Sequence, residues 1–321
     1  MIFEFINSTE NMEGSQIIHI IEHEGYGTLH QLIETLQEDF EQHVVCTYNL
    51  MSMKFVKSNV CYVIHTTGHF YPIISNLKLL FDNDVKVFVF LHVAPRYFEL
   101  KEKAFFLDYI CNIQHVYNLR CFCPSTEVAG QYKNIGLNVS SIQIGFPKIN
   151  LSLIKGTSNL EAYEQKYITV CTSSDPRYIH LKGINEFIDI MEKYGKKSDS
   201  LILGFDGTYR GIMCKRLQLN DFLYVLKNSK AYIQLSMTEA YNLTAVQAKR
   251  LRIPIIVSDI DGHKNCMKSI DNRLNIDEDF IEKFKLASSL ECINKNYKES
   301  CKRESIERFI KSIRTNIKGE I

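Results

Sequence analysis

A carboxylate and the start of a helix follow one another closely between Ser236 and Ala248. Glu239 lies in a loop after an apolar run, and a helical pattern begins near Asn242. The first turn of a helix exposes N–H groups at the positive end of its dipole, so Asn242, Leu243 and Thr244 could hold a diphosphate without a metal. A carboxylate beside that anion can stabilise positive charge that develops during a reaction. The segment predicts an anion site with an acidic neighbour.

Basic side chains stand in a second loop, after the apolar run Tyr167 to Cys171. Arg177 precedes Lys182 by five residues in this loop. Two cations close to a bound anion would stabilise its negative charge. Lys182 is the stronger candidate, whereas a surface salt bridge is an equally good interpretation of Arg177.

Two glycine pairs could let the backbone approach a ligand closely. Gly204 and Gly207 follow a short apolar run, and Gly25 and Gly27 stand before a helical pattern. The segment Gly204-Phe205-Asp206-Gly207 is also ordinary turn chemistry, so the first pair is weak evidence by itself.

Histidines end two of the apolar runs. His92 follows the run Val85 to Leu91, where a side chain would face a ligand at the carboxyl edge of a parallel sheet. A catalytic role and a structural hydrogen bond are equally good interpretations of His92. His65 and His69 flank a Thr-Thr-Gly segment, and for them we prefer a packing role.

Short β-rich runs alternate with helical patterns, which indicates repeated βαβ units. Several runs are almost continuously apolar, as in parallel strands covered on both faces. The runs are Gln16–Ile21, Val44–Thr47, Val60–His65, Val85–Leu91, Tyr167–Cys171, Leu201–Leu203, Tyr232–Leu235 and Ile253–Val257. Helical patterns cover Thr28–Phe40, Thr126–Ile135, Gly183–Tyr194 and Ser305–Ile317.

The length of 321 residues exceeds what one hydrophobic core usually supports. We therefore predict an α/β protein of two doubly wound, Rossmann-like domains, in residues 1–150 and 151–321. The linker is expected within Phe146 to Ser158, which combines Pro, Gly and polar residues. The last helical pattern could pack back on the N-terminal domain.

Composition excludes several classes of function. The chain has 38 basic and 37 acidic side chains, a net charge of +1, and so no field that would attract nucleic acid. Ten cysteines are scattered, and Cys121 with Cys123 is the one close pair, which favours reduced thiols and strand packing over a zinc site. No apolar run reaches the ~20 residues of a membrane span, and the N-terminus lacks the order of a signal peptide.

We expect a cytoplasmic protein on these grounds. Lys101 and Lys103 stand near Phe105 and Phe106, a combination that suits peripheral contact with a lipid surface. Packing of these aromatic residues in the core is the preferred interpretation.

The chemistry-bearing segment resembles a known signature. It reads Ser236-Met237-Thr238-Glu239-Ala240-Tyr241-Asn242-Leu243-Thr244-Ala245-Val246-Gln247-Ala248. It is similar to the motif of the family-four retaining glycosyltransferases of GT-B fold, in which Ser, Glu-Gly-Phe-Gly-Leu, a helix and a second Glu follow a strand. Pro254, the run to Asp259 and Gly262 resemble the family's continuation. The likeness is strong over residues 167–262 and loose over 15–147.

The resemblance implies two Rossmann-like domains that face a central cleft. It assigns Glu239 and His92 to the donor sugar, and Lys182 to the diphosphate. Gln247 replaces the Glu that binds ribose hydroxyls in the family; it keeps one acceptor oxygen and loses the charge.

The first Gly of the motif is Ala240 here, and the second is Asn242, which tolerates a positive φ better than most residues. A further Gly of the pattern is Arg252. The family's Gly-x-Gly turn beside the nucleotide corresponds to Gly204 and Gly207, and its acceptor-side glycine loop to Gly25 and Gly27.

The implied activity is transfer of a sugar, with retention, from a nucleotide diphosphate sugar such as a UDP- or GDP-sugar to a glycan, a glycolipid or another hydroxyl acceptor. No obligatory metal or cofactor is implied, and surface polysaccharide synthesis is the expected setting. Two alternatives stay open: a non-catalytic nucleotide-sugar-binding subunit of another transferase, and a nucleotide-sugar epimerase of the same fold. The base, the sugar, the acceptor and the linkage do not follow from the sequence.

Overall fold

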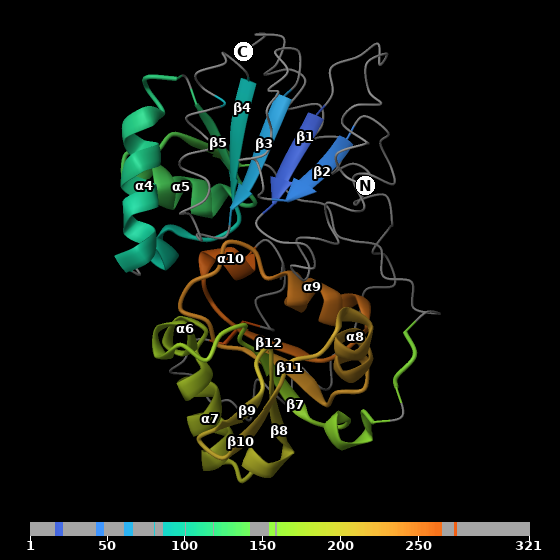
Figure 1. Cartoon of the computed structure of the whole chain (residues 1–321). Coiled ribbons are helices and arrows are strands. Elements are labelled where there is room, and N and C mark those ends of the chain that lie inside the picture. The colour runs from blue at the N-terminus through green and yellow to red at the C-terminus, as the bar shows by residue number, and fades with distance from the viewer. Residues whose placement is uncertain are drawn as a thin grey trace. The chain divides into compact units, whose positions relative to one another are not determined.

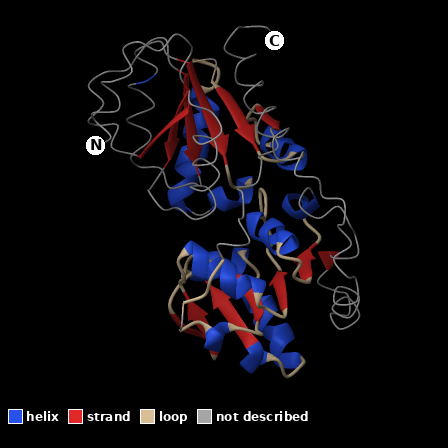
Figure 2. Ribbon diagram, turned by 90° about the vertical axis from the view of Figure 1, so that its right-hand side faces the viewer, coloured by secondary structure: helices blue, strands red, loops and turns tan. Residues whose placement is uncertain are grey.

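The computed structural model describes residues 17–21, 43–47, 61–66, 80, 86–99, 101–117, 119–141, 154–157, 159–264 and 273–274. These residues belong to two compact units, which separate between Pro147 and Lys148 (Figure 1). That point and the predicted limit at residues 150 and 151 lie outside the described residues, as does the helix predicted for 305–317. Figure 2 shows that the strands of each unit gather into a sheet with helices beside it.

The first unit contains a six-stranded sheet in the order β2-β1-β3-β4-β5-β6. Every neighbouring pair is parallel. The strands are β1 (Ile17–Ile21), β2 (His43–Thr47), β3 (Cys61–Thr66), β4 (Lys86–Leu91), β5 (Arg120–Cys123) and β6 (Val139–Ser141). Because β1 pairs with both β2 and β3, the strand order reverses between β1 and β3. Ligands of open α/β sheets bind at the carboxyl ends of strands at such a switch point.

The described helices of the first unit include one with a side-chain cap. They are η2 (Pro95–Glu99), α4 (Lys101–Ile113) and α5 (Thr126–Asn134). Ser125 Oγ accepts a hydrogen bond from the Val128 amide and so caps α5. In α4, Phe106 is buried, as core packing requires, whereas Phe105 is 59% exposed. Cys121 and Cys123 are buried in β5, as predicted.

The second unit contains a seven-stranded sheet in the order β13-β12-β11-β7-β8-β10-β9. The strands are β7 (Tyr167–Val170), β8 (Ser200–Leu203), β9 (Gly207–Tyr209), β10 (Ile212–Lys215), β11 (Ala231–Gln234), β12 (Ile255–Ser258) and β13 (Arg273–Leu274). β9 is antiparallel to β10, and this hairpin was not predicted. Its two-residue turn has positive φ at Arg210 and Gly211, the turn that suits the twist of paired strands. The order reverses between β7 and β11, which also pair.

Helices connect most strands of the second unit. They are η3 (Glu161–Tyr163), α6 (Pro176–Leu181), α7 (Ile184–Lys193), η4 (Lys197–Asp199), α8 (Leu219–Lys227), α9 (Leu243–Arg250) and α10 (Asp261–Lys264). α7 buries Phe187, Ile188 and Met191 in the same core as Ile233 of β11. None of the described helices is both long and apolar enough to cross a bilayer.

Candidate functional site

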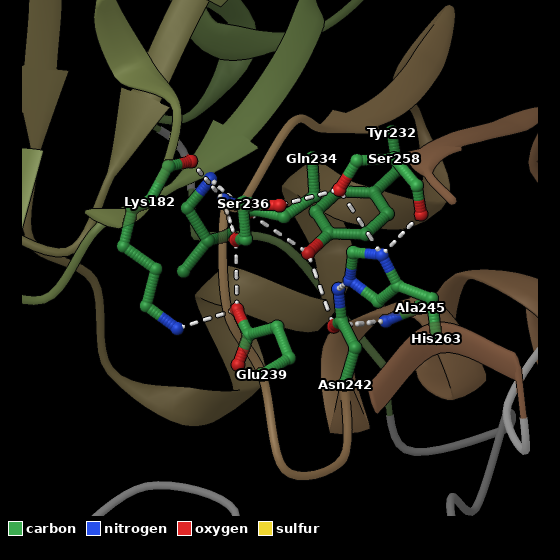
Figure 3. A network of polar contacts seen from close by, with 10 residues as sticks. Lys182, Tyr232, Gln234, Ser236, Glu239, Asn242, Ala245, Ser258 and His263 are labelled. Atoms are coloured by element: carbon green, nitrogen blue, oxygen red, sulfur yellow. Dashed lines mark hydrogen bonds and ion pairs between the residues drawn. The ribbon is translucent and has the colours of Figure 1, made fainter. Parts of the chain in front are cut away.

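A lysine and a glutamate meet where the strand order of the second unit reverses. Lys182 follows α6 after β7, and Glu239 lies between β11 and α9. Lys182 Nζ lies 2.6 Å from Glu239 Oε1, and the side chains are 19% and 10% exposed (Figure 3). A pair with so little exposure is screened by salt less than a surface pair. The fold thus brings together the two charged residues that the sequence placed at an anion site.

The carboxylate of Glu239 is oriented by a directed chain of hydrogen bonds. Gln234 Nε2 donates to the carbonyl oxygen of Lys182 at 2.7 Å and to Ser236 Oγ at 3.0 Å. Because Ser236 Oγ accepts there, its own hydrogen is donated to Glu239 Oε1 at 2.8 Å. Gln234 and Ser236 are fully buried. Oε1 therefore receives two hydrogen bonds, while Oε2 has no hydrogen-bond partner within the described ranges.

Asn242 caps α9, and a buried histidine fixes its orientation. Asn242 Oδ1 accepts from the Ala245 amide at 2.9 Å, and Nδ2 lies 3.0 Å from His263 Nε2. His263 Nδ1 lies 2.8 Å from the carbonyl oxygen of Ser258, which can only accept. His263 Nδ1 therefore carries the hydrogen, and Nε2 accepts from Asn242. Burial lowers the pKa of His263, in keeping with a neutral ring.

Asn242 stands where the motif has a glycine, but its backbone does not adopt a positive φ. Its φ is −86°, so the left-handed conformation that this position tolerates is not used. The asparagine serves instead as a side-chain cap of α9. By contrast, Arg252, which replaces another Gly of the motif, has φ +60° and thus keeps a backbone conformation that costs a non-glycine residue about 1–2 kcal/mol.

Gln247 lies in α9, four residues after Leu243, and is buried. Neither Nε2 nor Oε1 of its side chain has a hydrogen-bond partner among the described residues. A buried amide without partners costs several kcal/mol unless another molecule or segment satisfies it, roughly 2–7 kcal/mol by transfer data. An unsatisfied carboxamide at this place is compatible with the ribose-binding role that the resemblance implies for Gln247.

Three other residues predicted for the site are described by their local contacts and backbone. Arg177 Nη2 lies 2.6 Å from Asp175 Oδ2, and the Arg177 side chain is 47% exposed, so the salt-bridge interpretation describes it. A Cβ at Gly204 would lie 2.2 Å from the carbonyl oxygen of Cys171, which explains a glycine where two loops approach. Gly207 begins β9 with φ +123°.

Two further glycines hold the Glu239 loop. A Cβ at Gly262 would lie 1.9 Å from the carbonyl oxygen of Glu239, and one at Gly183 would lie 1.8 Å from that of Leu235. The sequence reasoning did not assign roles to these glycines, nor to Gln234 and His263. Gln234 could have been singled out from the sequence, because it is a polar residue within an otherwise apolar strand. The role of His263 depends on its contact with Asn242, which only the fold shows.

The first unit contains a chain of three histidines. His65 Nδ1 lies 2.8 Å from His92 Nε2, and His65 Nε2 lies 2.9 Å from His19 Nδ1. His92 is thus not a lone histidine, and His65 makes a hydrogen bond at each of its ring nitrogens in addition to packing in the core. Burial lowers the pKa of His65, helped by the neighbouring His92, and lowers that of His92 to about 3. Gly25, Gly27 and His69 lie outside the described residues.

Acidification should destabilise the first unit through His65 and His92. Unfolded histidine titrates near pH 6.5, whereas the folded pKa values lie lower. The unfolded chain therefore binds more protons, so the stabilisation is fully present above about pH 6.5 and is lost as the pH falls towards the folded pKa values. We expect a loss of up to about 1.4 kcal/mol per pH unit for each histidine that stays neutral.

Urea unfolding at several pH values, followed by circular dichroism, measures this slope. His92→Asn should flatten the slope, because one titrating ring is removed. Equal slopes in the variant and the parent protein would contradict the prediction.

No family model and no curated protein matches the chain. Solved structures do match over almost all of it. Sucrose-phosphate synthase from Thermosynechococcus elongatus has a TM-score of 0.61 at 12% identity, covering 92% of this chain and 94% of that one. Anabaena HepE in complex with UDP-glucose has a TM-score of 0.60 at 12% identity, covering 92% and 96%. Trehalose 6-phosphate synthase from Burkholderia multivorans has a TM-score of 0.53 at 11% identity, covering 95% of each chain. The chain therefore has the GT-B fold that the sequence predicted, with two Rossmann-like α/β units.

Proposed function

We propose that the second unit binds a nucleotide diphosphate sugar and that the chain transfers the sugar, with retention, to a hydroxyl of a glycan or glycolipid. The observation that carries the proposal is the partly buried pair of Lys182 and Glu239 beside the capped start of α9. Structures of the same fold support the donor class, since HepE was solved with UDP-glucose and an E. coli protein, described as trehalose-6-phosphate, with UDP-2-fluoro glucose.

The diphosphate belongs, in this proposal, between Lys182 and the first turn of α9. The amide of Thr244 lies at the positive end of the helix dipole, whereas that of Leu243 donates to the carbonyl oxygen of Tyr241 at 3.1 Å. An ammonium group has three hydrogens, so Lys182 can contact a phosphate oxygen while it keeps its hydrogen bond to Glu239. Gln247 would accept from one ribose hydroxyl and donate to the other, which would satisfy its buried carboxamide.

The reaction then needs charge stabilisation at two places. As the bond between the anomeric carbon and the phosphate oxygen breaks, Lys182 stabilises the negative charge on the leaving diphosphate. Glu239 Oε2 accepts a hydrogen bond from the sugar and stabilises positive charge at the anomeric carbon. The acceptor oxygen attacks from the same face, and its proton passes to the leaving phosphate, so the anomeric configuration is kept. We also propose, from the resemblance, that His92 contacts the donor sugar.

A non-catalytic donor-binding subunit is the second candidate. It is favoured by Gln247, because an uncharged amide stands where the family has a carboxylate. Such a subunit would bind the donor without turnover, whereas an epimerase would convert the donor without any acceptor. Analysis of the products formed with and without acceptor separates the three functions.

A binding panel tests the donor assignment. UDP, GDP and ADP, and a hexose derivative of each, are added in the presence of EDTA, and the thermal midpoint is followed against ligand concentration. We expect one base to raise the midpoint, because ligand at 100 times its Kd stabilises the folded state by about 2.7 kcal/mol. Lys182→Met should weaken that shift, and Lys197→Met, which removes a surface cation, should not. No shift with any nucleotide at millimolar concentration would refute the proposal.

A further inference from the structure

The geometry points to a row of three hydrogen-bonded histidines in the first unit, in which the position of one ring proton fixes the positions of the others. In this row, His19 and His65 are positioning residues that fix the ring and the tautomer of His92. Only the identity of the ligand that His92 meets rests on the proposed function.

The three rings step across neighbouring strands at the switch point of the sheet. His19 lies in β1, His65 near the end of β3, and His92 directly after β4; β3 pairs with both other strands. The ring centroids are 5.1 Å apart at each step. The three rings form a row and do not converge on one point. Among the described residues, no group of histidine, cysteine or acidic side chains is arranged to hold a metal ion.

Packing fixes the plane of the rings at the His92 end. The backbone N–H of His92 donates to the carbonyl oxygen of Thr66 at 2.8 Å. The ring of Phe90 lies 4.6 Å from that of His92 and 5.8 Å from that of His65, centroid to centroid. His19 and His65 are buried, whereas His92 is partly exposed. Neither His19 nor His65 can therefore contact a ligand from solvent directly.

Each link in the chain needs one N–H and one bare nitrogen. A neutral imidazole has one of each, so the order at one link dictates the order at the next. If His19 Nδ1 donates to His65 Nε2, then His65 Nδ1 donates to His92 Nε2, and all three rings carry hydrogen on Nδ1. In the reverse order all three carry hydrogen on Nε2. The three histidines must share one tautomer, and burial favours the neutral rings that this order requires.

The outer end of the chain is His92 Nδ1. This atom has no hydrogen-bond partner among the described residues. It is a donor in the first order and a bare acceptor in the second. A hydroxyl group can donate and accept, so it fits either order. The three histidines therefore present His92 Nδ1 to a hydroxyl of a bound ligand, which is a sugar hydroxyl if the proposed function holds. The buried rings determine which role His92 has.

Nuclear magnetic resonance of the chain with 15N-labelled histidine reads the tautomers directly. Long-range 1H–15N couplings distinguish Nδ1–H from Nε2–H, and substitution of each residue assigns its signals. We expect His19, His65 and His92 to be neutral at pH 7.5 and to share one tautomer. A cationic ring, or a ring whose tautomer differs from that of its neighbour, would overturn the inference. This measurement needs no activity.

Two substitutions of His65 separate positioning from packing. The amide of Asn reaches the place of Nδ1, so His65→Asn keeps a link to His92 and loses that to His19; the amide of Gln reaches the place of Nε2, so His65→Gln does the reverse. We expect His65→Gln to give His92 a mixture of tautomers and to lower kcat about tenfold at unchanged KM for the donor. His65→Asn keeps a hydrogen-bond partner for His92 but loses the order that His19 imposes, so we expect a smaller loss of kcat, about threefold.

Equal effects of the two variants on the His92 signals and on kcat would overturn the positioning role. If the chain has no transferase activity, the proposed function fails and the resonance data alone decide the inference. A variant that does not fold is recognised by circular dichroism, and the tautomers of the parent chain then give the decision.

Discussion

Replacing Glu239 by Gln should lower the rate of sugar transfer by about 10²–10³-fold, the effect of removing one preorganised electrostatic group from a transition state. Gln keeps the size of the side chain and an oxygen that can accept from Ser236 and Lys182. It removes the negative charge that would face the anomeric carbon. Because the diphosphate contacts are assigned to Lys182 and α9, the Kd for the nucleotide diphosphate should change only a few fold. Initial rates and calorimetric titration measure the two quantities.

A surface pair provides the matched control for this substitution. Glu192 Oε1 lies 3.2 Å from Lys197 Nζ, and the two side chains are 56% and 33% exposed. Exposed pairs contribute little, so Glu192→Gln should leave both rate and affinity unchanged. If Glu239→Gln turned over as fast as Glu192→Gln, Glu239 would have no catalytic role.

The strand order could not be read from the sequence, but the elements could. Apolar runs and helix caps are local signals, and they predicted strands such as β4 and β7 and helices such as α5 and α7. The loops after β7 and β11 also gave the residues of the charged pair, Lys182 and Glu239, because a loop after a parallel strand faces the ligand edge. It did not give the contact between Lys182 and Glu239, which depends on β7 and β11 becoming neighbours.

The residues behind the site could not be predicted for the same reason. The importance of Gln234, His263 and His65 lies in hydrogen bonds across strands or loops that are distant in sequence. Arg177 shows the opposite case, since it stands in the same loop as Lys182 in the sequence while its partner Asp175 is local. Spacing thus identified the charged groups, whereas only the fold distinguishes those that meet at the strand ends from those on the surface.

In the network around Glu239, hydrogen bonds to Oε1 orient the carboxylate, and Oε2 is the oxygen that would act on the sugar. Lys182 and Ser236 both donate to Oε1, and Gln234 binds Ser236 and the backbone of Lys182 at the same time. These residues fix the orientation of Oε2, although they need not contact a ligand themselves. A site built in this way should tolerate small changes of charge on the surface and respond strongly to small displacements of its loops.

Gly262→Ala tests that sensitivity at the backbone. The added Cβ would lie 1.9 Å from the carbonyl oxygen of Glu239 and 2.7 Å from its Cβ. Both atoms belong to or adjoin the backbone, so the loop itself must move, and displacement of a reacting group by about 1 Å can cost roughly 10²-fold in rate. We expect turnover to fall by that order and stability to fall by about 1–3 kcal/mol, the usual cost of overpacking.

Gly130→Ala is the control, because the same methyl group is added where it meets nothing. Gly130 lies within α5, and a Cβ there has no neighbour within 4 Å. Alanine favours the helix over glycine by about 0.5–1 kcal/mol, so this variant should be slightly more stable and fully active. Urea unfolding and initial rates of both variants are compared with the parent protein. Were Gly262→Ala as active as Gly130→Ala, the position of the Glu239 loop would not limit the reaction, and its carboxylate could not be the group on which transfer depends.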